Sequence, residues 1–208
     1  MRIPLAGLVV LATLFFSAAS EADEARTHDG FHMRWGVGLV AATGTSEGEN
    51  APYSFVAPGI LDGVQLGGNL RENLSLFFEA DSLILFSGNK NIGTDSKSEN
   101  NDTSETTTYG FLTGIGMGHY FMPANLYVSG AFGATLNNFA VSDDGIDFDT
   151  DNIGLGFTVM AGKEWWVSDG WGVGVGGQLL YMANKGEGTS KFTNHTLAFG
   201  MILTATYN

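Results

Sequence analysis

The most constraining feature of this chain is a two-residue alternation in its C-terminal third. Residues 153–159 place large apolar side chains at odd positions and glycine or threonine at even positions, in the order Ile-Gly-Leu-Gly-Phe-Thr-Val. Residues 171–176, Trp-Gly-Val-Gly-Val-Gly, repeat the pattern. Because successive side chains of a β-strand point to opposite faces, this period predicts strands with one apolar face and one nearly bare face. A bulky apolar outside and a small or polar inside suit a β-barrel that stands in lipid.

The first twenty residues contain the three parts of a secretory signal peptide. Arg2 gives a positive start, residues 5–16 form an apolar run, and residues 17–20 offer small side chains for cleavage after Ala19 or Ser20. The apolar run is too short for a spanning helix, which needs about 20 residues. A retained N-terminal anchor helix is the alternative interpretation.

The composition favours a narrow closed barrel. Glycine accounts for 30 of 208 residues, about twice its usual share of roughly 7%. Inside a narrow barrel, glycine leaves room for larger side chains from the opposite wall. The absence of cysteine excludes disulfides and thiolate metal sites. A net charge of −13 without a basic stripe makes nucleic acid a poor partner.

Eight segments have the pattern of strands. They are expected near 31–43, 54–67, 73–86, 107–121, 125–138, 152–166, 170–183 and 192–207. The second contains Pro58, which cannot donate a ladder hydrogen bond, so we expect a bulge or a late strand start there.

The connections between these segments alternate in length. Polar segments near 44–53, 87–106, 139–151 and 184–190 alternate with tight links at 68–72, 122–125 and 167–170. In outer-membrane barrels, long loops face the outside and tight turns face the periplasm. The even number of strands puts both chain ends on the periplasmic side. The segment near 87–106 has few hydrophobic residues and is predicted to be mobile.

In its number of strands, its alternation of apolar and small residues, and its alternation of long and short connections, the chain resembles the small eight-stranded outer-membrane barrels of the OmpA/OmpX type. The resemblance is architectural and covers nearly all of the chain after the signal peptide. It implies an all-β fold, an eight-stranded antiparallel up-and-down transmembrane β-barrel in the outer membrane of a Gram-negative bacterium. The expected organisation is a signal peptide at 1–20, a short periplasmic segment at 21–30 and the barrel at 31–208. Such barrels often finish on an aromatic residue, whereas this chain places Tyr207 one position before its end.

Four charged residues point to the barrel interior by their position in the alternation: Arg34, Glu79, Asp81 and Glu164. Charges in a narrow interior must pair, because desolvating them alone is costly. Arg34 could form its pair with either Glu79 or Glu164. Because eight strands leave an interior just wide enough for side chains to fill, we interpret this cluster as structural. A selective pore lining is the alternative.

Aromatic residues gather at the predicted periplasmic ends of the strands. They are Trp35, Phe121, Trp165, Trp171 and Tyr207. Amphipathic rings favour the lipid–water boundary, and barrels carry girdles of them. The alternative is ordinary packing at the strand ends of a soluble sandwich.

The sequence offers no complete catalytic set. A hydrolase or acyltransferase needs a nucleophile, a base and an orienting group close together. Only His195 lies near the predicted outer rim, and its phase points it outward. We therefore expect no enzymatic activity, no catalytic residues and no cofactor.

An acidic cluster lies between the fifth and sixth predicted strands. Asp147, Asp149 and Asp151 alternate as in a calcium loop. An EF-hand loop would need glycine at its sixth position and glutamate at its twelfth, but Asn152 and Thr158 stand there. We interpret the segment as a solvated acidic loop and expect no metal site.

The expected role is structural, adhesive or surface-interacting, through the extracellular loops. Expected partners are outer-membrane lipids and possible extracellular ligands or a host-cell surface, without nucleic acid. Two alternatives stay open. One is a soluble exported lipocalin-like barrel that binds a small apolar ligand, with its apolar face inside. The other is a lipid-modifying barrel enzyme that uses His195.

Overall fold

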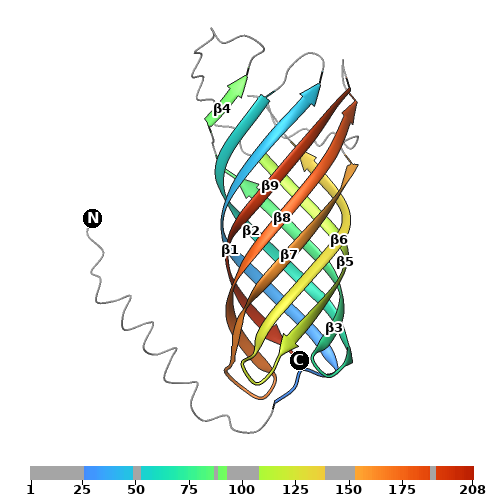
Figure 1. Ribbon diagram of the computed structural model, residues 1–208, viewed down its shortest axis with the longest axis vertical. Helices are drawn as coiled ribbons and strands as arrows, with labels where there is room; N and C mark the ends of the chain where they lie inside the picture. The colour runs from blue at the N-terminus through green and yellow to red at the C-terminus, as the bar shows by residue number, and fades with distance from the viewer. Residues whose placement is uncertain (1–25, 49–52, 87–88, 93–107, 139–152, 188–190) are drawn as a thin grey trace, which may run out of the picture.

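The computed structural model describes residues 26–48, 53–86, 89–92, 108–138, 153–187 and 191–208. These residues form a closed, tilted antiparallel β-barrel (Figure 1). The predicted signal peptide at 1–20 and the acidic cluster with Asp147, Asp149 and Asp151 lie outside the described residues. Within the part that is described, no helix is long and apolar enough to cross a membrane.

The described strands include all eight that the sequence predicts and a short additional one. They are β1 (Phe31–Gly48), β2 (Tyr53–Arg71), β3 (Leu74–Leu85), β4 (Asn89–Ile92), β5 (Thr108–Phe121), β6 (Leu126–Asn138), β7 (Ile153–Trp166), β8 (Trp171–Glu187) and β9 (Lys191–Tyr207). β1 and β8 continue several residues beyond their predicted ends. The polar residues there were interpreted as loop, but strand pairing continues through them.

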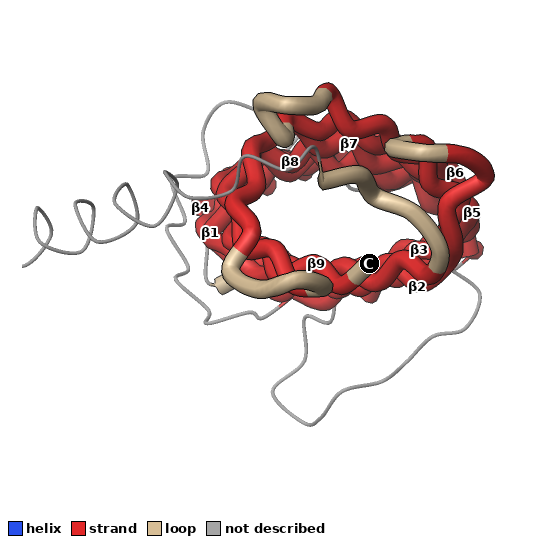
Figure 2. The backbone as a smooth tube through the Cα atoms, turned by 90° about the horizontal axis from the view of Figure 1, so that it is seen from below, coloured by secondary structure: helices blue, strands red, loops and turns tan. Residues whose placement is uncertain are grey.

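The eight long strands pair with their neighbours in chain order, and β1 closes the sheet by pairing with both β2 and β9. Seen from the end with the tight turns, the strands form a complete ring (Figure 2). The predicted all-β, eight-stranded antiparallel up-and-down barrel is therefore confirmed. Closure matters because no barrel strand is left with an unpaired edge in the hydrocarbon region.

Two expectations, one about the second predicted strand and one about the connection near 87–106, are wrong in detail. β2 runs without a register shift from Tyr53 past Pro58 along β1, so there is neither a bulge nor a late start. On the edge of β2 opposite β1, the partner strand changes at Pro58. Pairing with β3 ends at Gly59, and pairing with β4 begins at Val56. At that gap a missing backbone donor costs no ladder bond. β4 itself lies inside the segment near 87–106, part of which is therefore a strand.

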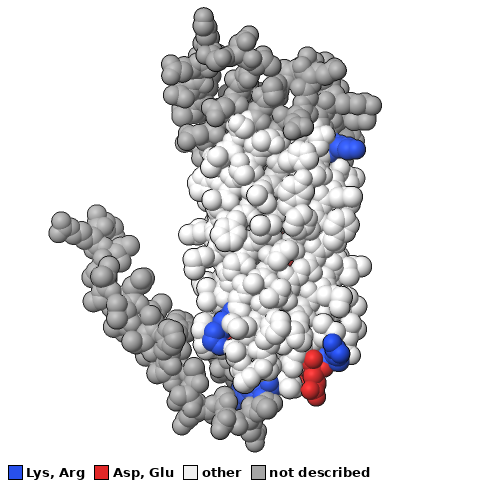
Figure 3. All heavy atoms as spheres, viewed as in Figure 1, with Lys and Arg blue, Asp and Glu red and all other residues white. Residues whose placement is uncertain are grey.

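The bulky apolar side chains of the alternating pattern face outward. Leu39, Ile115 and Met201 are 73%, 68% and 69% exposed. Figure 3 shows a wall almost free of charged atoms, with charge mainly at the lower rim and one cation near the upper rim. This arrangement is the reverse of a lipocalin-like barrel, in which the apolar face lines the inside.

The inward face is less uniform than the alternation predicts. Along β8, glycines near the lower end give way to Gln178, Leu180, Met182 and Asn184, all of them buried. Leu180 and Met182 belong to an apolar cluster that fills the upper interior. Its other large fully buried aliphatic members are Leu61, Leu83, Leu85, Leu112 and Ile202. The expectation of a small or polar interior therefore holds in part. The apolar cluster fills much of the upper interior, although the buried side chains of Thr135 and Asn184 form hydrogen bonds there as well.

Candidate functional site

Arg34 forms the centre of the lower interior. β1 points its guanidinium into the barrel, where the residue is 2% exposed. Nε and Nη2 each lie 3.1 Å from Oε1 of Glu164 on β7. Nη2 also donates to the hydroxyl of Tyr120 at 2.6 Å, and the guanidinium lies 3.9 Å from the ring centroid of Tyr127. A charge that is removed from water is tolerated only when it is paired and hydrogen-bonded, as the Arg34 guanidinium is here.

Of the two carboxylates that Arg34 could have paired with, Glu164 is the one in contact. Its Oε1 accepts a further hydrogen bond from Thr206 at 2.7 Å. Glu79 is linked to Arg34 indirectly, through Gln65. The side-chain oxygen of Gln65 accepts from Arg34 Nη1 at 3.3 Å, and its nitrogen donates to Glu79 Oε1 at 3.2 Å. The amide thus joins the cation to the second carboxylate.

Asp81 extends the polar interior upward from Glu79 on β3. Its Oδ2 accepts a hydrogen bond from Gln178 at 3.3 Å, and the same Gln178 nitrogen donates to Thr158 at 3.0 Å. Gly63 faces this carboxylate, and a Cβ there would lie 2.0 Å from Asp81 Oδ1. Glycine on the inner wall therefore leaves the space that a buried polar side chain occupies. Above Asp81, the apolar cluster begins with Leu83.

The residues that precede β1 close the end of the barrel that carries the tight turns. His28 is fully buried, and its ring stacks on Tyr120 with 3.5 Å between centroids. Its Nε2 lies 2.9 Å from Asn125 Oδ1 in the β5–β6 turn, and its backbone N–H donates to Asn73 Oδ1 in the β2–β3 turn. Arg26 donates to the carbonyl of Ser168 in the β7–β8 turn. We call residues 26–30 the mouth segment, which Figure 2 shows crossing the ring.

Burial lowers the pKa of His28 below its ordinary value, although the hydrogen bond to Asn125 opposes this shift. Transfer of an imidazolium from water into this stack is unfavourable, so the buried position favours the neutral ring. The mouth segment is therefore held by a neutral histidine between two turns.

The predicted girdle residues lie on the outward face at the end with the tight turns. Trp35, Phe121, Trp171 and Tyr207 are 53%, 51%, 41% and 40% exposed, and Trp165 is half-buried. Trp171 and Tyr207 contact each other with 5.2 Å between ring centroids. Lys163 lies over the Trp165 ring at 5.3 Å.

His195 lies on the outward face of β9, as its phase predicts. Its Nδ1 is 2.8 Å from the hydroxyl of Tyr181 on β8. Elsewhere within the described ranges, no group of three or more His, Cys, Asp or Glu side chains is placed to hold a metal ion.

Several residues of this arrangement were not predicted from the sequence. Tyr120 and Tyr127 occupy inward positions of β5 and β6, and the alternation alone could have assigned them to the interior. His28 had no such signal, because it precedes the first strand and its partners come from turns distant in sequence.

A family model described as the outer membrane protein beta-barrel domain matches residues 8–202. The chain is also similar to solved structures of low identity, one of which has a TM-score above 0.5 and shares the fold. The outer membrane protein OprG from Pseudomonas aeruginosa is 7% identical with a TM-score of 0.51, covering 89% of this chain and 100% of that one. Neisserial surface protein A is 14% identical with a TM-score of 0.47, covering 86% and 99%. No curated protein matches the sequence.

Replacing Arg34 with methionine should destabilise the barrel by about 3–5 kcal/mol, because Glu164 would remain as an uncompensated buried charge. Equilibrium urea unfolding in lipid vesicles would measure the loss. The double variant R34M/E164Q should recover much of it, since both charges are then removed. Arg71→Met, at an exposed residue, is the control and should change the free energy of unfolding little. Equal stability of R34M and the parent would refute the assigned pairing.

The mouth segment should loosen in acid. Because the folded pKa of His28 is lowered, its neutral form contributes stability above the unfolded pKa of about 6.5, and this contribution is lost as pH falls below that value. Hydrogen exchange of the backbone amides of His28 and Asn73, compared at pH 7.5 and pH 5 after correction for intrinsic rates, would report the opening. In His28→Gln the protection of Asn73 should no longer depend on pH. A pH dependence that persists in this variant would assign the effect to another group.

Proposed function

Because the chain belongs to the outer membrane protein beta-barrel family and is an integral outer-membrane protein, we propose that it is a closed barrel that interacts with other surfaces through its extracellular segments. We also propose that residues 1–20 are a cleaved signal peptide and that 21–30 remain in the periplasm. The observation that carries the proposal is the filled interior. Arg34, Glu164 and Glu79 in the lower half are at most 2% exposed, and every member of the apolar cluster is at most 8% exposed.

The filled interior favours a non-conducting barrel over a pore. A water-filled channel requires inward polar side chains with access to solvent, as in barrels of 16 or more strands. In this chain the inward positions Leu83, Leu112 and Leu180 are each 1% exposed. Arg34 and Glu164 pair with each other, and Glu79 and Asp81 each accept a hydrogen bond from a buried glutamine. A structural role for these four residues therefore fits better than ion selectivity.

The girdle side chains support the orientation of the barrel. Trp35, Phe121, Trp165, Trp171 and Tyr207 would lie at the inner boundary of the outer membrane, where amphipathic rings are favourable. The termini and tight turns then face the periplasm, and the segments near 44–53, 87–106, 139–151 and 184–190 face outward.

The composition of the outward segments indicates the chemistry of a partner. Residues 139–151 contain Asp143, Asp144, Asp147, Asp149 and Asp151 and no Lys or Arg. A cluster of negative charges at the outer surface attracts cationic groups and raises the rate at which they encounter the protein. We therefore propose a basic extracellular ligand or host-cell surface as the partner. We propose no enzymatic activity and no cofactor.

Conductance measurements test the closed barrel. The protein in planar bilayers should give no stepwise conductance, and liposomes that contain it should not swell in isosmotic sugar solutions, because the interior side chains leave no aqueous path. A general porin in the same membranes is the positive control. Sugar uptake at a rate comparable to that of the porin would contradict the proposal.

The surface role predicts that adhesion depends on the acidic segment. Bacteria that express the variant D143N/D144N/D147N/D149N/D151N should adhere to a basic-peptide-coated surface several-fold less than bacteria with the parent chain, since the attraction is electrostatic. Adhesion of the parent should fall as salt shortens the screening length.

The matched control keeps the charge of the same segment and changes its apolar residues, I146S/F148S. This control should adhere as the parent does, with equal surface expression measured by protease accessibility. Unchanged adhesion of the aspartate variant would remove the acidic segment from the proposal while leaving the conductance result unaffected.

A further inference from the structure

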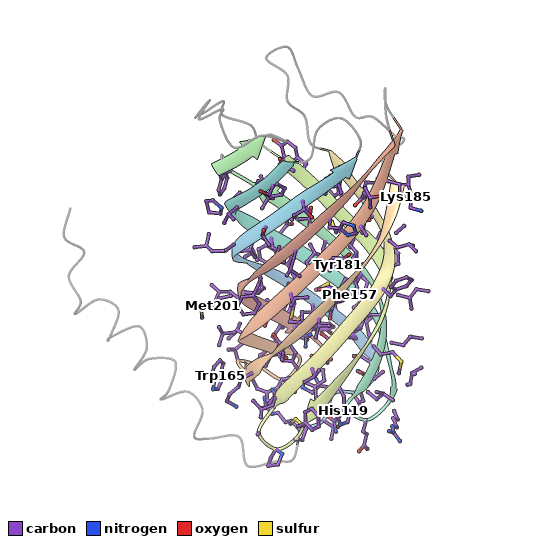
Figure 4. All side chains as sticks on the ribbon, turned by 45° about the horizontal axis from the view of Figure 1, so that its top comes forward. His119, Phe157, Trp165, Tyr181, Lys185 and Met201 are labelled. Carbon is purple, nitrogen blue, oxygen red and sulfur yellow. The ribbon has the colours of Figure 1, made fainter. Side chains whose placement is uncertain are left out.

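A small polar cluster interrupts the apolar outer wall near the upper end of β8 and β9. It consists of Tyr181, Lys185 and His195, which we call the rim cluster. The Tyr181 hydroxyl lies 2.8 Å from His195 Nδ1, and the two rings are stacked at 26° with 6.1 Å between centroids. Phe157 packs on the other side of Tyr181 at 5.4 Å. Figure 4 shows Tyr181 and Phe157 near each other, with Lys185 closer to the upper rim.

Strand register places the three side chains of the rim cluster on one patch. Lys185 pairs with Thr193, and Tyr181 pairs with Leu197. His195 lies between these two levels, opposite Ala183. It is therefore the diagonal neighbour of both Lys185 and Tyr181, at a distance of about 7–8 Å for such positions. Ala183, which stands opposite His195, has a small side chain, and His195 itself is partly exposed.

The height of the rim cluster can be estimated from the girdle. Trp171 and Tyr207 pair at the lower end of β8 and β9, and Tyr181 lies ten residues along β8 from Trp171. At about 3.3 Å per residue and a tilt of about 40°, ten residues rise by about 25 Å. This rise equals the height of the apolar band of outer-membrane barrels, about 25 Å. Tyr181 thus lies at the outer boundary of the hydrocarbon, with His195 and Lys185 at the level of the headgroups.

The chemistry of the cluster fits an anion in a protein that is otherwise strongly acidic. Lys185 is exposed, and the ion pairs between described side chains, Arg26–Asp169 and Arg34–Glu164, do not involve it. When the Tyr181 hydroxyl donates to Nδ1, the proton of the neutral imidazole sits on Nε2, and His195 presents an N–H donor. An ammonium group and an N–H donor side by side are suited to phosphate oxygens.

We propose that Tyr181, Lys185 and His195 bind the phosphate group of a phosphorylated glycolipid in the outer leaflet of the membrane. Lys185 supplies the charge, His195 donates a hydrogen bond, and Tyr181 fixes the imidazole while its ring and Phe157 contact the upper part of the acyl chains. The site is independent of the acidic extracellular segments, and it binds a lipid without transforming it.

Native mass spectrometry of the full mature chain in dodecylmaltoside tests the proposal, with diphosphoryl lipid A as the probe and bound lipid counted per barrel. The variant K185A/H195F should lose at least about tenfold in apparent affinity. Tyr181→Phe should lose less, because it removes only the hydroxyl that orients the ring. Heat-dependent gel mobility would verify that each variant is a folded barrel.

Two controls separate this site from general attraction. Arg71→Ala, which removes an exposed cation at the opposite rim, should bind lipid A as the parent does. Phosphatidylcholine, whose phosphate is neutralised by its choline, should bind the parent and K185A/H195F equally. Wild-type affinity of K185A/H195F for lipid A would overturn the proposal. The proposal would also be overturned if Arg71→Ala lost as much affinity for lipid A as K185A/H195F does. It would likewise be overturned if K185A/H195F lost equal affinity for lipid A and for phosphatidylcholine.

Discussion

Closure of the sheet through β1 is the constraint on which the rest of the structure depends. A polypeptide in hydrocarbon must satisfy its backbone donors and acceptors internally, and a sheet does so only when its first and last strands meet. β1 meets both β2 and β9 over most of its length. Once the ring is closed, each residue of a strand faces either lipid or a narrow interior. The outward side chains are therefore mostly apolar, and the inward side chains are a mixture of polar and apolar residues.

The narrow interior then has to be filled, and the chain fills it with two kinds of contact. In the lower half, one guanidinium is surrounded by Glu164, Tyr120, Tyr127 and Gln65, because a buried charge is tolerated only when its donors are satisfied. In the upper half, leucines from four strands, Met182 and Ile202 pack together, and the pairs Thr135–Asn184 and Asn137–Thr196 form hydrogen bonds on the same inner wall. The mouth segment closes the lower end through contacts with all three tight turns. The barrel is therefore closed along its axis by polar and apolar layers in series.

The fold could be predicted in most respects from alternation, because a period of two requires no knowledge of distant contacts. Phe157 outside and Gly156 inside illustrate this, as does the exposure of Trp35. The same reasoning was weaker where a strand is apolar on both faces. Leu180 and Met182 share the inward face with glycines, and their presence there shows that the interior of this barrel is partly hydrophobic. The path of β2 past Pro58 was also mispredicted, because the change of partner from β3 to β4 is not encoded near the proline.

By itself, the sequence determined the strand number, the alternation of tight and long connections, and the face on which each side chain lies. These are local properties, set by side-chain period and turn composition. Only the tertiary structure decided that Arg34 contacts Glu164 and reaches Glu79 through Gln65, that His28 closes the mouth, and that Tyr181 holds His195. The paired residues are separated by 130 positions for Arg34 and Glu164 and by 97 for His28 and Asn125. Which inward or outward residues meet at such separations depends on the tilt and stagger of the closed sheet, and no local pattern in the chain specifies either of them.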